Sequence, residues 1–342
     1  MRELSRRDVL RWSALGLTAA TLAGCGGTPP PLPPTGRIDV HQHMIPDAYR
    51  RWLATHGALD VGGIAVPEWS ASAAMASMDR TGTAKALLSV SAPGVTPAAN
   101  DADADDMART INDAGAELAK DHPDRFGFLA TVPLPAVDAA AREATRALDE
   151  LGADGVILLA HSADTYLGQP GQTDLFAELD RRHAVVLVHP GPLPGPAVPG
   201  IPPLAADFLL DTTRAAYLLV RNEVVAKYPD IRYVLSHAGG FLPYAADRIA
   251  LVIARDTGLD PTVVRNQFRN FYFDTALSTG AATLPALLAF AKPGHTVFGS
   301  DWPFTPQAAV DQFTDGLDHY PGVDEAGRQA IDRDNAVALF SR

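Results

Sequence analysis

The 342-residue sequence predicts a protein of the α/β class, folded as a (β/α)8 TIM barrel over residues 37–342. Short apolar runs rich in β-branched residues recur eight times, and amphipathic segments with helical spacing separate them. This alternation predicts a parallel sheet with helical crossovers, and eight repeats are enough to close a barrel. The main alternative is an open doubly wound sheet, which should carry a glycine-rich phosphate loop after its first strand. The chain has His-Gln-His at that place instead.

The first 25 residues are predicted to be an export signal that precedes the barrel. Arg6 and Arg7 stand in the stretch SRRDVL, which resembles a twin-arginine signal, and an uncharged run too short for a lasting membrane helix follows. The tetrapeptide LAGC then ends at Cys25 and resembles a lipobox, in which that cysteine is lipidated. We therefore expect export by the twin-arginine route and a periplasmic or other extracytoplasmic location. The contact with the membrane is then through an N-terminal lipid anchor alone.

Residues 26–36 form a proline-rich linker, which is expected to be extended and to build no core. Cys25 is the only cysteine of the chain, so an intrachain disulfide and a thiolate metal cluster are both excluded. The net charge of −12 and the lack of a basic stripe argue against nucleic-acid binding.

The predicted strands come at regular intervals along the barrel segment. Amphipathic stretches lie between them, and the clearest are residues 101–124 and 137–155. The eight strands are expected at 37–40, 84–90, 126–132, 155–159, 185–188, 233–235, 271–273 and 296–298.

Histidines and one aspartate follow four of these strands. His41 and His43 follow the first strand, and their spacing places both on one face. His189, His237 and Asp301 follow the fifth, sixth and eighth strands. Each alone is more often a hydrogen-bonded structural residue, but the strands of a parallel barrel all end at the same rim. Imidazoles and a carboxylate gathered there suit one divalent metal ion, with a position left open for water or substrate.

These motifs resemble the amidohydrolase superfamily, in the branch typified by aminocarboxymuconate-semialdehyde decarboxylase. The resemblance covers nearly all of residues 37–342 and is most similar to the 6-methylsalicylate decarboxylase group. It rests on IDVHQHMIPD, LLSVSAPGV, DRFGFLATVPLP, LDELGADGVILL, VVLVHPGPLP, YVLSHAGGFLPYAADRI, FYFDTA, VFGSDWPF and DRDNAVALF. The resemblance implies a barrel of the metal-dependent hydrolase type.

The resemblance also implies a role for each strand-end residue. The metal ligands would be His41, His43, His189 and Asp301, and Asp301 would also shuttle a proton. His237 would be the acid or base beside the metal.

A lysine that would bridge two metals is missing at the end of the fourth strand, where His161 stands as a pocket or loop residue. One divalent ion is therefore expected, Zn²⁺ first and Mn²⁺ as the alternative. Substrate contacts are expected from Arg248, which would hold a carboxylate, and from Trp302 and Phe304, which would pack on an apolar ring. Each of these three has a structural alternative, either a surface ion pair or core packing.

The predicted function is metal-dependent, non-oxidative decarboxylation of a small aromatic or unsaturated carboxylic acid similar to 6-methylsalicylate. Hydrolysis of a lactone, ester or amide, with His237 as general base, is the alternative within the same fold. A lipoprotein that retains a metal without doing chemistry is the second alternative. The expected partner is a small carboxylic acid, and family members suggest a homodimer.

Overall fold

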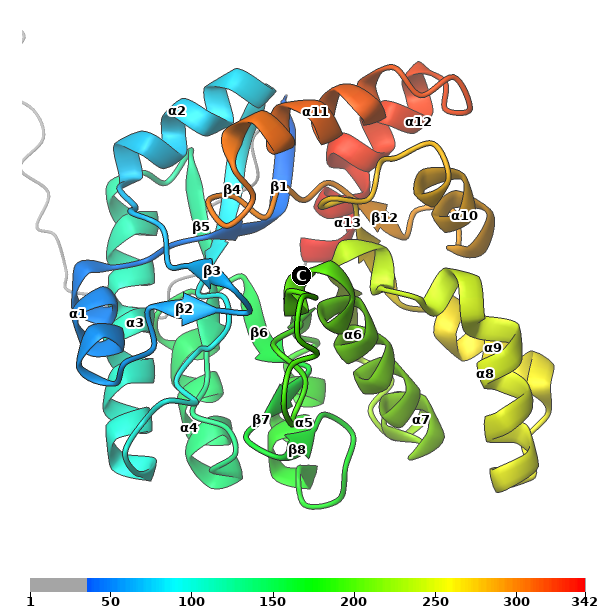
Figure 1. Cartoon of the computed structure of the whole chain (residues 1–342), viewed down its shortest axis with the longest axis horizontal. Coiled ribbons are helices and arrows are strands. Elements are labelled where there is room, and N and C mark those ends of the chain that lie inside the picture. Colours follow the sequence, from blue (N-terminus) through cyan, green and yellow to red (C-terminus); the bar gives the residue numbers. More distant parts are fainter. Residues whose placement is uncertain (1–35, 342) are drawn as a thin grey trace, which may run out of the picture.

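The computed structural model describes residues 36–341, which form a barrel of eight parallel strands surrounded by helices (Figure 1). The predicted export signal, Cys25 and nearly all of the predicted linker lie outside the described residues. The barrel strands are β1 (Arg37–His43), β4 (Thr83–Ser89), β5 (Phe126–Thr131), β6 (Gly155–Leu159), β9 (Val185–His189), β10 (Arg232–Leu235), β11 (Tyr272–Asp274) and β12 (Thr296–Val297).

The strands follow one another around the barrel in chain order, each parallel to the next. The sheet closes between the last strand and the first. The amide of Val40 donates to the carbonyl of Phe298 at 3.0 Å, and Gln42 forms a parallel bridge with Trp302. The eight predicted strands are thus confirmed, and all eight carboxyl ends meet at one rim.

Helices cover the outside of the barrel, as the amphipathic segments predict. The predicted helices at 101–124 and 137–155 are present and end earlier than expected. The helices are α1 (Asp47–Thr55), α2 (Ala71–Thr81), α3 (Asp101–Asp121), α4 (Val137–Asp149), α5 (Thr173–Arg181), α6 (Pro203–Arg221), α7 (Val224–Lys227), α8 (Leu242–Thr257), α9 (Pro261–Arg269), α10 (Thr283–Phe290), α11 (Gln307–Asp318), α12 (Glu325–Gln329) and α13 (Asn335–Phe340). None of the helices within residues 36–341 has the length and apolar character needed to span a bilayer.

Two small hairpins rise from the carboxyl rim, and the sequence reading did not anticipate either. One pairs β2 (Asp60–Val61) with β3 (Ile64–Ala65), and the other pairs β7 (His161–Ser162) with β8 (Thr165–Tyr166). At the opposite end, the π-helical turn η3 (Ala330–Asp334) and α13 lie under the barrel.

Apolar side chains at alternate positions of the strands fill the barrel interior. Ile38, Leu87, Leu129 and Leu187 are buried there with other strand residues, and Leu339 of α13 packs against the same cluster. Because strand side chains alternate in direction, this interior core and the core beneath the outer helices use alternate positions of each strand. The interior is therefore solid below the rim, and only the rim leaves room for a ligand.

Candidate metal centre

His41 and His43 end strand β1 and turn their ring nitrogens toward the same point. The strand continues to His43, three residues beyond its predicted end. The Nε2 atoms of the two rings lie 3.1 Å apart, and both side chains are fully buried. The two histidines therefore share one face, as their spacing predicts.

His189 and Asp301 bring two further donor atoms to the same point. Oδ1 of Asp301 lies 3.0 Å from Nε2 of His43, 3.3 Å from Nε2 of His41 and 3.9 Å from Nε2 of His189. Asp301 follows β12 with φ +58°, and its backbone amide donates to the carbonyl of His41 at 2.7 Å. Strand β12 and strand β1 are neighbours in the closed barrel, so closure itself sets the position of Asp301.

The other nitrogen of each of these rings is already committed to an acceptor. Nδ1 of His41 donates to Oδ2 of Asp274 at 2.7 Å, and Nδ1 of His189 donates to the carbonyl of Pro190 at 2.8 Å. Nδ1 of His43 lies 3.1 Å from Oγ of Ser89. A histidine that donates through Nδ1 carries its lone pair on Nε2, which is the arrangement that outer hydrogen bonds impose on metal ligands.

His189 supplies the observation that tests whether a metal fits. Its Nε2 is buried and has no hydrogen-bond partner among the described residues. A buried polar atom without a partner is costly in a native protein. A divalent cation at this point would accept the lone pairs of His41, His43 and His189 together with the charge of Asp301. The donor set, three imidazoles and one carboxylate, is of the kind that zinc and similar ions take.

Burial and charge set the protonation states of these groups. Burial lowers the pKa of His43, and it lowers the pKa of His189 to about 4. Burial also disfavours the charged form of His41, but the Asp274 carboxylate outweighs it and raises the pKa of His41 to about 10. Burial alone would raise the pKa of Asp301, yet the three imidazoles around it, those of His189, His41 and His43, hold it well below its usual range. The site therefore presents a carboxylate and the neutral rings of His43 and His189, which are the forms that bind metals. A metal bound at Nε2 of His41 would displace the proton that the neighbouring carboxylates stabilise on that ring.

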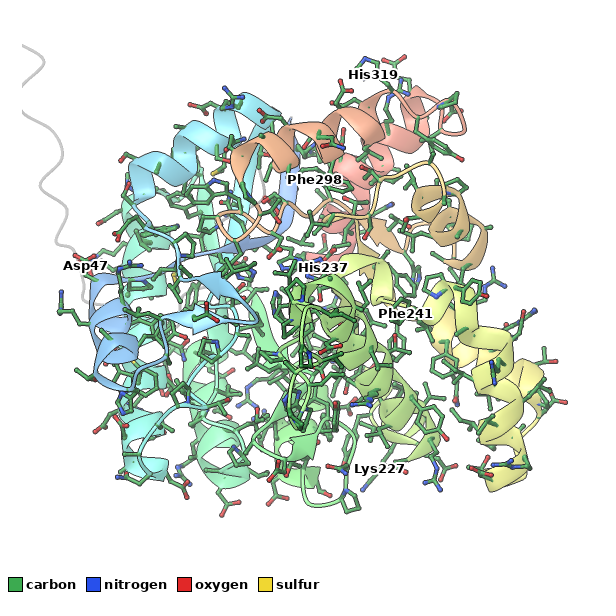
Figure 2. The ribbon with its side chains drawn as sticks, viewed as in Figure 1. Asp47, Lys227, His237, Phe241, Phe298 and His319 are labelled. Carbon is green, nitrogen blue, oxygen red and sulfur yellow. The ribbon has the colours of Figure 1, made fainter. Side chains whose placement is uncertain are left out.

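His237 stands at the edge of this cluster rather than at its centre. It begins a short 3-10 turn after β10, with φ +53°, and its backbone amide donates to Oδ1 of Asp274 at 2.9 Å. Its ring centroid lies 5.1 Å from that of His41, and Nδ1 is 3.3 Å from the carbonyl of Ala276. In Figure 2, His237 lies near the middle of the molecule, whereas Asp47 and His319 lie at its periphery.

A second set of four residues, with His237 in place of His43, could also bind a metal ion. Donor atoms of His41, His189, His237 and Asp301 all lie within 4.8 Å of one another. We place His43 among the ligands because its Nε2 is 3.0 Å from Asp301 and 3.1 Å from Nε2 of His41. His237 then faces the cavity described next.

A cavity of about 380 Å³ opens directly above the cluster. His189, His237 and Asp301 form its metal-side wall, and most of the other lining residues are apolar. Pockets of this size and lining are typical of small-molecule sites. The remaining lining residues are Ile64, Ser91, Leu204, Ala205, Phe208, Leu209, Gly240, Leu277, Ser278, Thr283, Phe304, Thr305 and Pro306.

The three residues expected to contact substrate are placed differently. Phe304 lines the cavity, and its ring stands edge-on to that of His43 at 5.6 Å. Trp302 is buried in the core beside α1 and α3, and does not line the cavity. Arg248 lies on the exposed face of α8 and is not among the lining residues either.

His161 is held away from the metal cluster by a buried carboxylate. Its Nδ1 lies 3.0 Å from both carboxylate oxygens of Asp211 on α6, and the amide of Gly191 donates to the same carboxylate at 2.9 Å. Asp211 thus ties together the loops that follow β6 and β9. His161 contributes to the structure of the rim and is not one of the residues that line the cavity.

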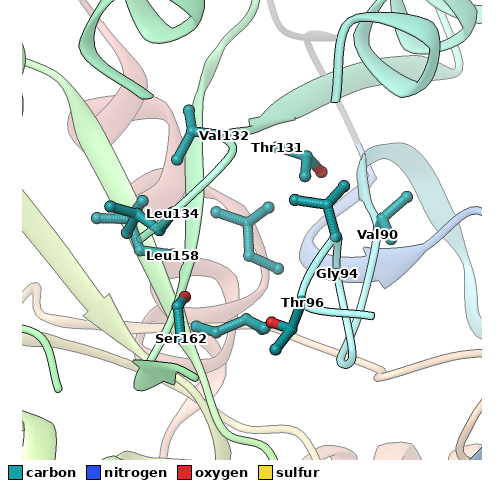
Figure 3. Close-up of a pocket in the computed structure, with 11 residues that line it drawn as sticks. Val90, Gly94, Thr96, Thr131, Val132, Leu134, Leu158 and Ser162 are labelled. Carbon is teal, nitrogen blue, oxygen red and sulfur yellow. The ribbon is translucent and has the colours of Figure 1, made fainter. Parts of the chain in front are cut away.

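A second cavity lies nearby, between the ends of β4, β5 and β6 (Figure 3). Val90, Thr131, Leu158 and Ser162 are among the residues that line it. Its volume of about 20 Å³ has room for a water molecule and not for an organic acid. The larger cavity is therefore the candidate substrate site.

The sequence reading missed Asp274 as a functional residue. This fully buried carboxylate accepts from Nδ1 of His41 and from the backbone amides of His237 and Ala276. Its position in the motif FYFDTA, at the end of the seventh barrel strand, was the feature of the sequence that could have indicated a functional role.

The family model described as amidohydrolase matches residues 38–342. The chain is 37% identical to the decarboxylase yanB of Aspergillus niger, over 90% of this chain and 88% of that protein. It is 36% identical to the 6-methylsalicylic acid decarboxylase of Penicillium expansum, over 90% of this chain and 96% of that one.

Solved structures agree with this similarity. A crystal structure described as an amidohydrolase II superposes with a TM-score of 0.85 and 32% identity, over 90% of this chain and 100% of the other. Two decarboxylases share the fold at lower identity, and both structures hold manganese. They are the dihydroxybenzoic acid decarboxylase of Polaromonas (TM-score 0.70, 24% identity, 89% and 96% of the chains) and the 5-carboxyvanillate decarboxylase of Novosphingobium aromaticivorans (0.74, 22%, 93% and 98%).

Proposed function

This chain belongs to the amidohydrolase family, and from that premise we propose that it is a metal-dependent decarboxylase of small aromatic carboxylic acids. One observation carries the proposal: imidazole nitrogens and a carboxylate converge beneath a largely apolar cavity of about 380 Å³. The relatives at 36–37% identity, which cover 90% of this chain, are decarboxylases. They favour decarboxylation over the hydrolytic and non-catalytic alternatives that the sequence alone leaves open.

The ion would be held by His41, His43, His189 and Asp301. When bound, a divalent ion supplies a positive charge that polarises substrate oxygens. The sequence favours Zn²⁺, whereas two decarboxylases of the same fold hold manganese. We therefore take Mn²⁺ as the ion to test first and Zn²⁺ as its competitor.

The protein's own residues then perform three tasks. The apolar walls, including Phe304, hold an aromatic ring and exclude water from it. His237 faces the cavity with a ring whose pKa is lowered by burial. Its Nδ1 lies 3.3 Å from the carbonyl of Ala276, which leaves Nε2 to exchange a proton with the substrate.

The bond between the ring carbon and the carboxylate breaks, and carbon dioxide leaves. The electron pair of that bond stays on the ring carbon. Nε2 of His237, or the carboxylate of Asp301, first takes up a proton from the substrate hydroxyl or from solvent and then delivers it to the ring carbon, where it replaces the lost group. Orientation in the cavity and fixed charge supply most of the rate enhancement in such a site.

Export and membrane attachment are part of the same proposal. Their support is the stretch SRRDVL and the LAGC tetrapeptide that ends at Cys25. Labelling of cells with a palmitate analogue checks this, because the wild-type chain should incorporate the label and the Cys25→Ser chain should not. A homodimer stays a prediction, and the mass of the purified chain in solution checks it.

The experiment that tests the function uses the full chain in detergent. The metal is removed with a chelator, Mn²⁺ or Zn²⁺ is added back, and carbon dioxide is measured from 6-methylsalicylate and other salicylates. We expect one ion per chain and carbon dioxide release that depends on it. A chain that holds one ion and opens lactones, with no release of carbon dioxide, would be a hydrolase.

A further inference from the structure

The wall of the cavity that does not carry the metal ligands comes from two separate segments. Ile64 reaches it from hairpin β2–β3, whereas Leu204 and Phe208 reach it from the first turns of α6. More than 130 residues separate these segments in the chain. Figure 1 shows the hairpin in front of the strand ends, on the side where α6 begins.

The tip of the hairpin is built to pack closely on α6. Gly62 and Gly63 form the tip with φ of +62° and +88°, a conformation that glycine adopts without strain. A Cβ at Gly62 would lie 2.8 Å from Cζ of Phe208, and a Cβ at Gly63 would lie 3.6 Å from Cβ of Pro202. Only glycine at position 62 allows this approach without a shift of Phe208.

The base of the hairpin is fixed as well. The amide of Val66 donates to the carbonyl of Leu59 at 2.9 Å, and Val61 is buried in the core. Nη1 of Arg50 on α1 donates to the carbonyls of Val66 and Pro67 at 2.9 and 2.8 Å. Both the base and the tip of the hairpin therefore contact the rest of the protein. These contacts hold Ile64 in place as part of the cavity wall.

This wall carries no charge. Among the described residues that line the cavity, the ionisable side chains are His189, His237 and Asp301, all on the metal side. Neither lysine nor arginine is among the lining residues within the described part of the chain. A second carboxylate on a substrate ring, placed against Ile64 and Phe208, would lie on a partly buried apolar wall without a cationic partner, and loss of its hydration there is disfavoured.

We propose that hairpin β2–β3 and the start of α6 determine substrate specificity, with Ile64 as the central residue. They select aromatic monocarboxylates whose ring edge opposite the metal is uncharged, and they reject dicarboxylates. The inference rests on the decarboxylase function proposed above and assigns the residues that choose among its substrates.

The test compares 6-methylsalicylate with salicylates that carry a second carboxylate at one of the other ring positions. For the wild-type chain loaded with metal, kcat/KM should be about 10-fold or more lower for the dicarboxylates whose second carboxylate lies on the ring edge opposite the metal, because that charge is left unpaired against an apolar wall. In Ile64→Arg, at least one dicarboxylate should gain about 10-fold or more in kcat/KM, while 6-methylsalicylate loses activity. Calorimetric titration of the metal-loaded chain should show the same reversal in Kd.

Two controls keep the result specific. Ile64→Leu should keep the wild-type preference, and Val263→Arg adds the same charge at an exposed position of α9 and should change neither substrate. If Ile64→Arg does not fold, Leu204→Arg brings a guanidinium to the same wall from a side chain that is 40% exposed.

The outcomes separate the two proposals. The specificity role would be overturned if the wild type turned over mono- and dicarboxylates with similar kcat/KM. It would also be overturned if a folded arginine variant kept the wild-type preference. Either result would leave the decarboxylase function in place. No carbon dioxide from any acid, with one ion bound per chain, would instead remove the decarboxylase and with it this inference.

Discussion

The two ends of the barrel bury charged and titratable side chains in opposite ways. At the carboxyl rim, donor atoms of His41, His43 and Asp301 crowd together, and Nε2 of His189 has no partner among the described residues. At the amino end, the guanidinium of Arg37 is 8% exposed and fully engaged.

The contacts of Arg37 show what a satisfied buried charge looks like. Its Nε donates to Oδ1 of Asp332 at 2.7 Å, Nη1 to the carbonyl of Thr81 at 2.6 Å and Nη2 to Oδ1 of Asp318 at 2.5 Å. Lys85, inside the same end of the barrel, donates to the carbonyl of Pro123 at 3.2 Å. Burial is therefore no guide to function by itself. Donor atoms that lack partners, next to a cavity, distinguish the rim from the base.

The largest effect is expected from the ligands at the rim. His189→Ala removes a buried donor atom that only a metal would use, so the ion and the activity should both be lost, with kcat reduced by at least about 10³-fold. Elemental analysis and carbon dioxide release check this. The chelator-treated wild type and the variant should unfold at similar temperatures. Full metal content in the variant would show that His189 is not a ligand.

His237→Ala is expected to separate chemistry from metal binding. The ring faces the cavity at the edge of the cluster, so the variant should keep one ion per chain and lose about 10²–10⁴-fold in kcat. Parallel measurement of kcat and metal content decides the matter. If the variant loses metal as completely as His189→Ala does, His237 is a ligand and the choice of His43 in its place is wrong.

Asp274→Asn should produce a smaller, graded loss. The carboxylate holds Nδ1 of His41 and the backbone amide of His237, and amide substitution keeps the shape while it removes the charge. Loss of such an outer partner typically costs about 10–100-fold in metal affinity or activity. Titration with Mn²⁺ in a competing chelator measures the change. If both the metal Kd and kcat were unchanged, Asp274 would not support metal binding or catalysis through His41 and His237.

Arg37→Met tests the base of the barrel. Its carboxylate partners Asp318 and Asp332 are 40% and 22% exposed, so water screens their charge and the expected loss in free energy of unfolding is about 1–3 kcal/mol. Urea unfolding measures that loss. Metal content and kcat should stay at wild-type levels under native conditions, since the variant changes the end of the barrel far from the rim. A fall in metal content would mean that the two ends are coupled.

The sequence predicts that the candidate ligands converge because strand order and strand direction suffice to place them. A parallel barrel brings every strand end to one rim, so His41, His189 and Asp301 converge whatever the details of packing. The role of Asp274 depends on a side-chain contact with His41 over the intervening strand β12, and strand spacing does not encode such a contact. Arg248 shows the same limit, because the distance from His237 along the chain does not decide which face of α8 the side chain occupies.

Hairpin β2–β3 could have been found from sequence and was not. The Gly62–Gly63 pair between apolar residues is a short-range hairpin signal, but each strand has only two residues, too few for a periodic pattern. Its place over the cavity depends on contact with Phe208, which lies far along the chain. The proposed specificity wall is therefore a tertiary feature, whereas the position of the candidate metal ligands follows from the order of the strands.

The smallest effect is expected at a third kind of charged group, one on the outer surface. Asp103 on α3 accepts from Nε1 of Trp52 at 2.8 Å and from the amide of Ala99 at 2.9 Å, and these bonds lower the pKa of its carboxyl. A depressed pKa in the folded state means that the carboxylate stabilises the fold above its ordinary pKa. That contribution disappears as pH falls through the lowered value.

Asp103→Asn should therefore lower the free energy of unfolding at pH 7 by less than about 1 kcal/mol, since solvent screens the group. The difference from wild type should shrink as pH falls below about 4, the ordinary pKa of an aspartate. Urea unfolding of both chains between pH 7 and pH 3 measures it. A loss as large as that of Arg37→Met would break the comparison, because exposure would then not separate strong from weak charged contacts in this barrel.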